Sequence, residues 1–240
     1  MELTLVNGTL DASAIYALMK LKTLNALQLI DVTLVASEAK GLAAAIRLHA
    51  LSGLVLTTWT LPDSAFIEAL ESIGTKLICK VNHAIPGQDF DALARYGHLE
   101  LLNLGESDID TSHECCIHLC KRTTTLKQLI CKSAPGDRSG RILSHLNVSR
   151  LTLTGAIDDI AIDGLAWNTT IESLMFVRVP LHRDWVVKLS SMKSLKTLFI
   201  RHPTPAKREP HLGNVLPPAP IDTKWLETKP GAPGCAIIFI

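Results

Sequence analysis

The residues best suited to chemistry lie close together between His113 and Cys120, in the run His-Glu-Cys-Cys-Ile-His-Leu-Cys. Cys116 and Cys120 are four residues apart, so in a helix they share one face and could contribute two ligands to a metal ion. A closed zinc site needs four ligands, usually from two separated pairs, and the chain has no separate CxxC or HxxxH pair. We therefore interpret these cysteines as small apolar side chains packed in a helix layer, and we expect no metal and no cofactor.

Motifs of nucleophilic and nucleotide-dependent catalysis are missing from the sequence. It contains no GxSxG, HExxH, P-loop or GxGxxG pattern, and its nine histidines are scattered. The acidic pairs Asp158-Asp159 and Asp108/Asp110 are more typical of helix caps and solvated turns than of an acid/base couple. The sequence thus predicts a protein that is not an enzyme, with no catalytic residues.

Composition and charge restrict the partners further. Lys and Arg number 24 and Asp and Glu 23, so the chain lacks the basic excess of most nucleic-acid binders, and nucleic acid is not expected as a partner. No apolar run approaches the roughly 18 residues that cross a bilayer, so no membrane insertion is expected. Hydrophobic residues make up 47% of the chain but aromatic residues only 5%, which predicts a core of Leu, Ile, Val and Ala.

The compartment is predicted from the cysteines and from the start of the chain. The start, Met1–Leu5, has neither the basic region nor the apolar stretch of a signal peptide. Six cysteines follow no disulfide framework, which favours reduced thiols inside the cell, in the cytoplasm first. Without a signal peptide, the glycosylation sequons at Asn7, Asn147 and Asn168 are interpreted as chance.

A repeat organises most of the chain. Two apolar residues separated by one position recur at intervals of 22 to 27 residues. The pairs are Leu3/Leu5, Leu27/Leu29, Leu54/Leu56, Leu77/Cys79, Leu102/Leu104, Leu129/Cys131, Leu151/Leu153, Leu174/Phe176 and Leu198/Ile200. Another apolar residue usually lies three positions before each pair, and only Gly74 breaks this rule. The motif is therefore LxxLxL, nine times in phase.

This motif and its period resemble the leucine-rich-repeat family, over residues 1–202. The resemblance implies an α/β solenoid of about nine repeats, with a curved parallel sheet on the concave face and helices on the convex face. Five residues after the first leucine of LxL, many family members carry an asparagine that bonds the backbone. Here that column holds Gly8, Val32, Trp59, Asn82, Ser107, Ala134, Ala156, Val179 and Pro203, so no close subfamily is assigned.

The local pattern favours the same architecture. Alternating apolar residues in LxL are typical of a strand with one buried face. Amphipathic stretches at 11–21, 37–48, 63–73 and 88–96 predict a helix after each strand, with Asp11, Asp63 and Asp110 placed to cap helices. A unit of this size cannot bury its apolar face alone, so neighbouring units must stack.

Both ends of the chain leave alternatives open. Only two residues precede Leu3, so the first strand edge is covered by its own unit or by a partner, or the chain is a fragment. Residues 203–240 form a Pro-rich extension that ends in Cys-Ala-Ile-Ile-Phe-Ile. This apolar terminus either folds back onto the last repeat, which we favour, or docks into a neighbouring molecule.

The concave sheet face is the predicted site of function. The residue inside each LxL points outward there, and several of these residues are apolar and flanked by Lys and Arg, as in protein interfaces. The predicted partner-binding residues are Val55, Ile78, Leu101, Asn103, Ile130, Met175, Phe199, Lys80, Lys132 and Arg178. The alternative is that β propensity alone placed these residues, or that the tail covers Met175 and Phe199.

The predicted function is a protein–protein interaction module, an adaptor or constitutive subunit of a larger intracellular assembly. Two alternatives remain from the sequence alone. One is a sensor that binds a peptide reversibly on the concave face. The other is a substrate-recruiting arm of an enzyme that resides on another chain.

Overall fold

The computed structural model describes residues 1–57, 64–71, 73–81, 87–107, 109–122, 126–201 and 235–240. Strands and helices alternate along these residues. The strands are β1 (Glu2–Leu10), β2 (Ala26–Leu34), β3 (Gly53–Thr57), β4 (Lys76–Lys80), β5 (Leu99–Asn103), β6 (Gln128–Ser133), β7 (Arg150–Gly155), β8 (Ser173–Val177), β9 (Thr197–Arg201) and β10 (Ala236–Phe239). The helices are α1 (Ala12–Met19), α2 (Ala39–Leu48), α3 (Ser64–Glu71), α4 (Gly87–Arg95), α5 (Glu114–Arg122), α6 (Asp137–His145), α7 (Asp159–Trp167) and α8 (Arg183–Ser190).

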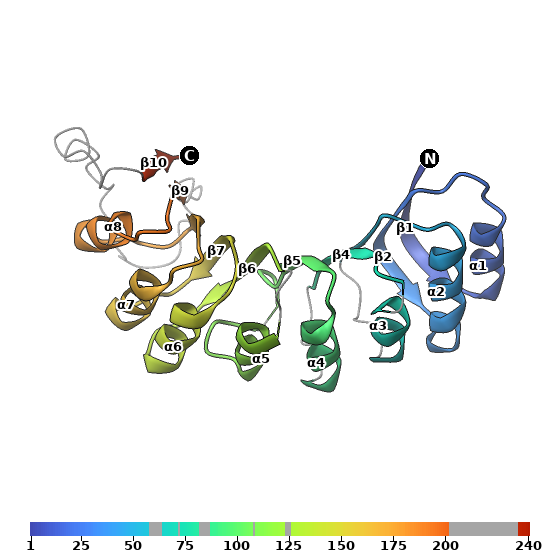
Figure 1. Ribbon diagram of the computed structural model, residues 1–240, viewed down its shortest axis with the longest axis horizontal. Coiled ribbons are helices and arrows are strands. Elements are labelled where there is room, and N and C mark those ends of the chain that lie inside the picture. The colour runs from blue at the N-terminus through green and yellow to red at the C-terminus, as the bar shows by residue number, and fades with distance from the viewer. Residues whose placement is uncertain (58–63, 72, 82–86, 108, 123–125, 202–234) are drawn as a thin grey trace, which may run out of the picture.

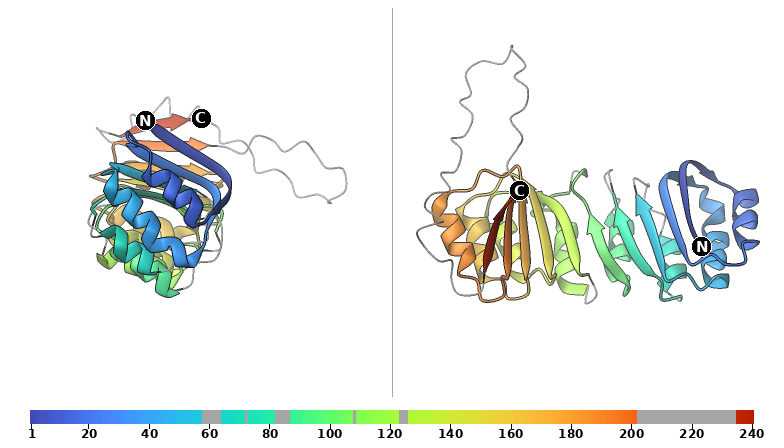
Figure 2. Two further views of the ribbon diagram at one scale, coloured as in Figure 1. Left: turned by 90° about the vertical axis from the view of Figure 1, so that its right-hand side faces the viewer. Right: turned by 90° about the horizontal axis from the view of Figure 1, so that it is seen from above.

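The fold is α/β, with one parallel sheet whose strands alternate with helices. Within the described residues the sheet has ten strands, and their order in space is their order in the chain, from β1 to β10. Figure 1 shows the sheet along the inner side of an arc and the helices along its outer side. The view from above in Figure 2 looks onto the bare face of the sheet. The expected layers, a concave sheet and convex helices in a solenoid-like stack, are confirmed.

The predicted apolar pairs form the strand side of the core. From Leu27/Leu29 to Leu198/Ile200, both members of every pair are buried, and they pack against apolar residues of the helices. Leu3 and Leu5 of β1 are only partly buried, because β1 has a neighbouring strand on one side only. The LxL pattern therefore predicted the buried strand residues correctly.

The ends of several helices also agree with the sequence. Asp11 caps α1, because its carboxylate accepts a hydrogen bond from the backbone N–H of Ala14 at 2.9 Å. Asp158 caps α7 in the same way, through the N–H of Ala161 at 2.9 Å. Asp63 lies outside the described residues. Asp110 differs from expectation: its carboxylate accepts from the N–H of Ser112 at 2.8 Å and closes a turn before α5 instead of capping the helix.

The exception at Gly74 has a conformational cause. Gly74 follows α3 with φ of +73°, and its N–H donates to the carbonyl of Leu70 at 3.3 Å. This left-handed conformation ends the helix and strongly favours glycine over a leucine. At this position the repeat therefore has a glycine that ends the helix, in place of the usual apolar residue.

The apolar C-terminus folds back onto the same chain. Residues 236–239 form β10, which pairs in parallel with β9 through Ala236 opposite Thr197 and Phe239 opposite Ile200. The preferred fold-back is thus confirmed for these residues, and β10 extends the sheet sideways instead of lying over Met175 and Phe199. The Pro-rich part of the extension, 203–234, lies outside the described residues.

Candidate binding surface

The concave face of the sheet presents side chains that the core does not bury. On β2 to β9 the residue inside each LxL is partly exposed while its two neighbours are buried. Figures 1 and 2 show the helices on the opposite side of the sheet. Among the residues that the structure describes, no helix or strand covers this face.

A first row of side chains crosses β2 to β6. It consists of Gln28, Val55, Ile78, Leu101 and Gln128, which are direct neighbours in the strand register. Val55, Ile78 and Leu101 are consecutive members and all partly exposed, so they form one apolar patch. Neighbouring parallel strands are about 4.8 Å apart, which places these side chains in contact range of a single ligand.

A second row lies two residues further along the strands. It consists of Lys80, Asn103, Ile130, Thr152, Met175, Phe199 and Ile238, on β4 to β10. Its apolar end is Met175, Phe199 and Ile238, and Ile238 is 37% exposed. The C-terminal strand therefore enlarges the surface that the sequence predicted, by adding one isoleucine beside Phe199.

The residues inside LxL fall in two rows because the sheet changes register between β4 and β5. Leu77 pairs with Leu99, but Ile78 pairs with Leu101, so Glu100 is an extra residue on β5. The residues inside LxL, which the sequence places on the concave face, therefore do not form one continuous row: the neighbour of Ile78 is Leu101, and Asn103 lies beside Lys80. The bulge puts two consecutive side chains on the concave side of the strand.

Glu100, the extra residue of the bulge, forms ion pairs with two lysines. The Glu100 carboxylate lies 2.9 Å from the Lys127 ammonium and 3.4 Å from that of Lys76. The hydrogen bond from Lys127 and the proximity of both cations lower the pKa of Glu100 despite its partial burial. Both lysines are largely exposed, so the pairs contribute little to stability and leave a net positive charge beside the first row.

Three of the predicted polar residues differ in their surroundings. Lys132 faces the concave side from β6, in register with Thr154 of β7. Asn103 is engaged locally, because its side-chain oxygen accepts a hydrogen bond from the N–H of Gly105 at 3.0 Å. Arg178 belongs to neither row, since it follows β8 with φ of +58° and is exposed at the end of the strand.

The cysteines occupy core positions, as the repeat alignment predicts. Cys79, Cys116 and Cys131 are buried, and Cys120 is half-buried with its thiol 3.5 Å from the carbonyl of Ile142. The side chain of Cys115 lies outside the described ones. Among the described residues, no group of three His, Cys, Asp or Glu is arranged to hold a metal ion.

Burial makes the core thiols resistant to deprotonation. Burial raises the pKa of Cys79 and of Cys131 to about 12, from an ordinary value of 9.0, and that of Cys120 to about 11. The folded chain therefore holds these protons more tightly than the unfolded chain. The corresponding stability is complete below pH 9.0 and is lost as the pH rises toward about 12.

We expect Cys79 and Cys131 to remain unmodified when the folded protein is treated with iodoacetamide at about pH 8, because only thiolates react. Among the cysteines with described side chains, half-buried Cys235 should react first, and all cysteines should react in denaturant. Mass spectrometry of the peptides measures the modified fraction at each position. Rapid labelling of Cys131 in the folded chain would contradict its burial.

Two features of the surface were missed from the sequence. In the segment that contains the bulge, the apolar pair of the repeat fits either Leu99/Leu101 or Leu102/Leu104. This ambiguity was the signal in the sequence that could have indicated a bulge. Ile238 carried no repeat signal, because a strand of four residues after a long interruption is outside any period.

The described helices include none long and apolar enough to span a bilayer.

No protein-family model and no curated protein matches this chain. The fold itself defines a class: an α/β protein with one curved parallel sheet, one face of which is covered by helices. The other face presents the two rows of partly exposed side chains.

Proposed function

We propose that this chain is a leucine-rich-repeat protein that acts without catalysis, by binding a protein partner on its concave sheet face. One observation supports this proposal above all: the apolar patches Val55–Ile78–Leu101 and Met175–Phe199–Ile238 are partly exposed on a face that no described helix or strand covers. Apolar patches of this kind on a sheet face are typical of interaction sites.

The energetics favour a protein partner. Removing apolar area from water contributes about 25 cal/mol per Å², so the two patches can supply much of the binding free energy. Lys80, two residues after Ile78 on β4, places a positive charge beside the first patch, and Lys132 adds another on the same face from β6. These charges favour a partner with acidic groups around an apolar centre. The stacked units hold these side chains in fixed positions, which limits the entropy lost on binding.

We further propose that the protein is an adaptor or a constitutive subunit of an intracellular assembly, most simply in the cytoplasm. The five cysteines with described side chains form no disulfide with one another, which supports a reducing compartment. Under this proposal the isolated chain exposes its apolar patches and is expected to associate with itself. A monodisperse monomer of high stability would count heavily against a constitutive subunit.

The first test replaces Ile78 with glutamate in the tagged full chain. A carboxylate in the centre of the apolar patch removes an apolar contact and must lose its water when the partner binds, so we expect more than a tenfold loss of affinity for the native partner. The measurement is quantitative recovery of that partner by affinity purification from the native cell, followed by sizing with light scattering. Circular dichroism checks that the variant remains folded.

The matched control is Leu48→Glu, an equivalent change at an exposed position of α2 on the helical side. It should leave the recovery of the partner unchanged. If Ile78→Glu recovers as much partner as the control does, the concave face is not the binding site and the proposal fails.

A reversible peptide sensor is the second candidate, and one observation favours it. Strand β10 covers the edge of β9 from within the chain, so that edge is not offered to another subunit. A sensor should purify as a free monomer and lose peptide binding in Ile78→Glu. A constitutive subunit should instead be recovered in one stoichiometric complex.

A further inference from the structure

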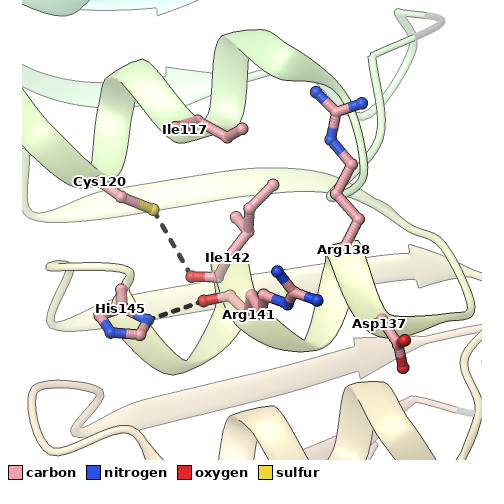
Figure 3. Close-up of a pocket in the computed structure, with 7 residues that line it drawn as sticks. All are labelled: Ile117, Cys120, Asp137, Arg138, Arg141, Ile142 and His145. Carbon is pink, nitrogen blue, oxygen red and sulfur yellow. Dashed lines mark hydrogen bonds between the residues drawn. The ribbon is translucent and has the colours of Figure 1, made fainter.

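The helical side of the molecule has a groove between α5 and α6, shown in Figure 3. Its volume is about 680 Å³, and it is lined by Ile117, Cys120, Asp137, Arg138, Arg141, Ile142 and His145. Ile117, Cys120 and Ile142 form an apolar floor, of which Ile142 is 6% exposed. The volume and the apolar lining fall within the range of ligand-binding sites.

The groove arises because α6 packs more closely on α7 than on α5. Gly140 of α6 faces Gly164 of α7, and a Cβ on Gly140 would lie 2.7 Å from the carbonyl oxygen of Ile160. The two glycines thus bring the backbones of α6 and α7 into contact. Helix α6 contacts α7 far more extensively than it contacts α5, so the space on its α5 side stays open.

The walls of this groove carry positive charge. Arg138 and Arg141 are both exposed on α6, and His145 lies one turn beyond Arg141. Figure 3 shows Arg138 extending from α6 alongside the groove. Asp137 is the single carboxylate among the lining residues. Guanidinium groups bind carboxylates in a bidentate manner, so acidic groups complement these walls.

A second hollow continues the surface across α6. It lies between α6 and α7 and shares Asp137, Arg141 and His145 with the groove. Its rim includes Trp167, which is 79% exposed, and Ile160, which is 46% exposed. Trp and Arg are the residue types that contribute most often to binding free energy in protein interfaces.

We propose that the α5–α6 groove binds an acidic amphipathic helix of another protein, with its apolar side chains on Ile117, Cys120 and Ile142 and its carboxylates on Arg138 and Arg141. Two walls of nine residues each give a groove roughly 13 Å long, enough for two turns of a docked helix. Anchors at positions i, i+4 and i+7 of such a helix span about 10.5 Å and fit within this length.

This site goes beyond the concave surface, because it lies on the opposite side of the sheet. A partner on the concave rows leaves the groove accessible, so, resting on the proposed function, one copy of the protein can hold two partners at once. The chain then acts as a bridge between an apolar surface bound by the sheet and an acidic helix bound by α5 and α6.

The test uses the full chain and a fluorescein-labelled amphipathic peptide with leucines at helical spacing and glutamates at the flanking positions. Fluorescence anisotropy should show saturable binding that weakens with added salt. The double variant Arg138→Glu, Arg141→Glu should bind the peptide at least tenfold more weakly. A peptide with lysines in place of the glutamates should not bind to the unaltered chain.

The charge-matched control is the double variant Lys40→Glu, Lys193→Glu, at exposed positions of α2 and of the turn after α8. It should bind the acidic peptide as the unaltered chain does, and so should Ile78→Glu. Equal weakening in the control, no saturable binding, or loss of binding in Ile78→Glu would each overturn the groove as the site. Ile117→Ala should weaken binding without altering the circular dichroism spectrum.

Discussion

Replacing Asn168 with alanine is expected to lower the free energy of unfolding by about 3 kcal/mol or more. The Asn168 side chain is 3% exposed and makes four hydrogen bonds to backbone groups. Its amide nitrogen donates to the carbonyls of Leu143 and Leu146, both at 2.8 Å, and its oxygen accepts from the N–H groups of Thr170 at 2.8 Å and Ile171 at 3.0 Å. Alanine leaves all four groups without this partner inside the fold.

Urea denaturation measures the change in the free energy of unfolding. Asn168→Asp keeps the shape but turns an oxygen toward the two carbonyls, so it should destabilise the fold as well. The control is Asn147→Ala, at an exposed position, where a change within about 0.5 kcal/mol is expected. Equal effects at both asparagines would show that the buried hydrogen bonds are not a main source of stability.

The same contacts bear on the sequon at Asn168. Glycosylation attaches a sugar to the side-chain nitrogen, and that nitrogen donates both hydrogens to backbone carbonyls inside the chain. These contacts support the interpretation of this sequon as chance. Asn168 instead follows α7 and connects it to the turn of the preceding unit.

Gly164→Ala is expected to lower the free energy of unfolding by about 2 kcal/mol, although alanine has the higher helix propensity. A Cβ at this position would meet the carbonyl group of Gly140 on α6 directly. Both contacting groups are backbone, so α6 and α7 must move apart to relieve the overlap. Thermal unfolding followed by circular dichroism should show a lower midpoint.

Gly41→Ala provides a control of opposite sign. Gly41 is within α2, and a Cβ there would meet Ile15 Cγ2 at 3.4 Å, an ordinary contact. Without a clash, the higher helix propensity of alanine should stabilise the protein, by up to about 1 kcal/mol. If Gly164→Ala also stabilises the protein, the close approach of α6 and α7 is not required by the fold.

The periodic part of the structure could be predicted because one physical requirement repeats in each unit. Pairs such as Leu151/Leu153 are buried on the sheet side, and the cysteines at Cys79 and Cys131 substitute for leucine in the same column. Asp11 and Asp158 likewise cap helices where a short polar side chain precedes an apolar stretch. Burial and capping are local rules, so a single sequence reveals them.

Contacts between units follow no such local rule. Gly140 and Gly164 are opposite one another only because α6 and α7 stack. Nothing in the sequence around either glycine identifies the other as its contact. The extra residue Glu100 changes the pairing of β5 with β4 but not with β6, a choice that depends on both neighbouring strands. The concave residues could therefore be named from the sequence, while their division into two rows could not.

The bulge at Glu100 also determines the path that an elongated ligand must follow. The apolar side chains of the first row end at Leu101 on β5, and those of the second row begin at Ile130 on β6. Because Leu101 is in register with Gln128, the path shifts by two residues along the strand, roughly 7 Å, as it passes between these strands. A peptide that crosses the strands in a straight line meets only one patch, whereas one that runs obliquely meets both.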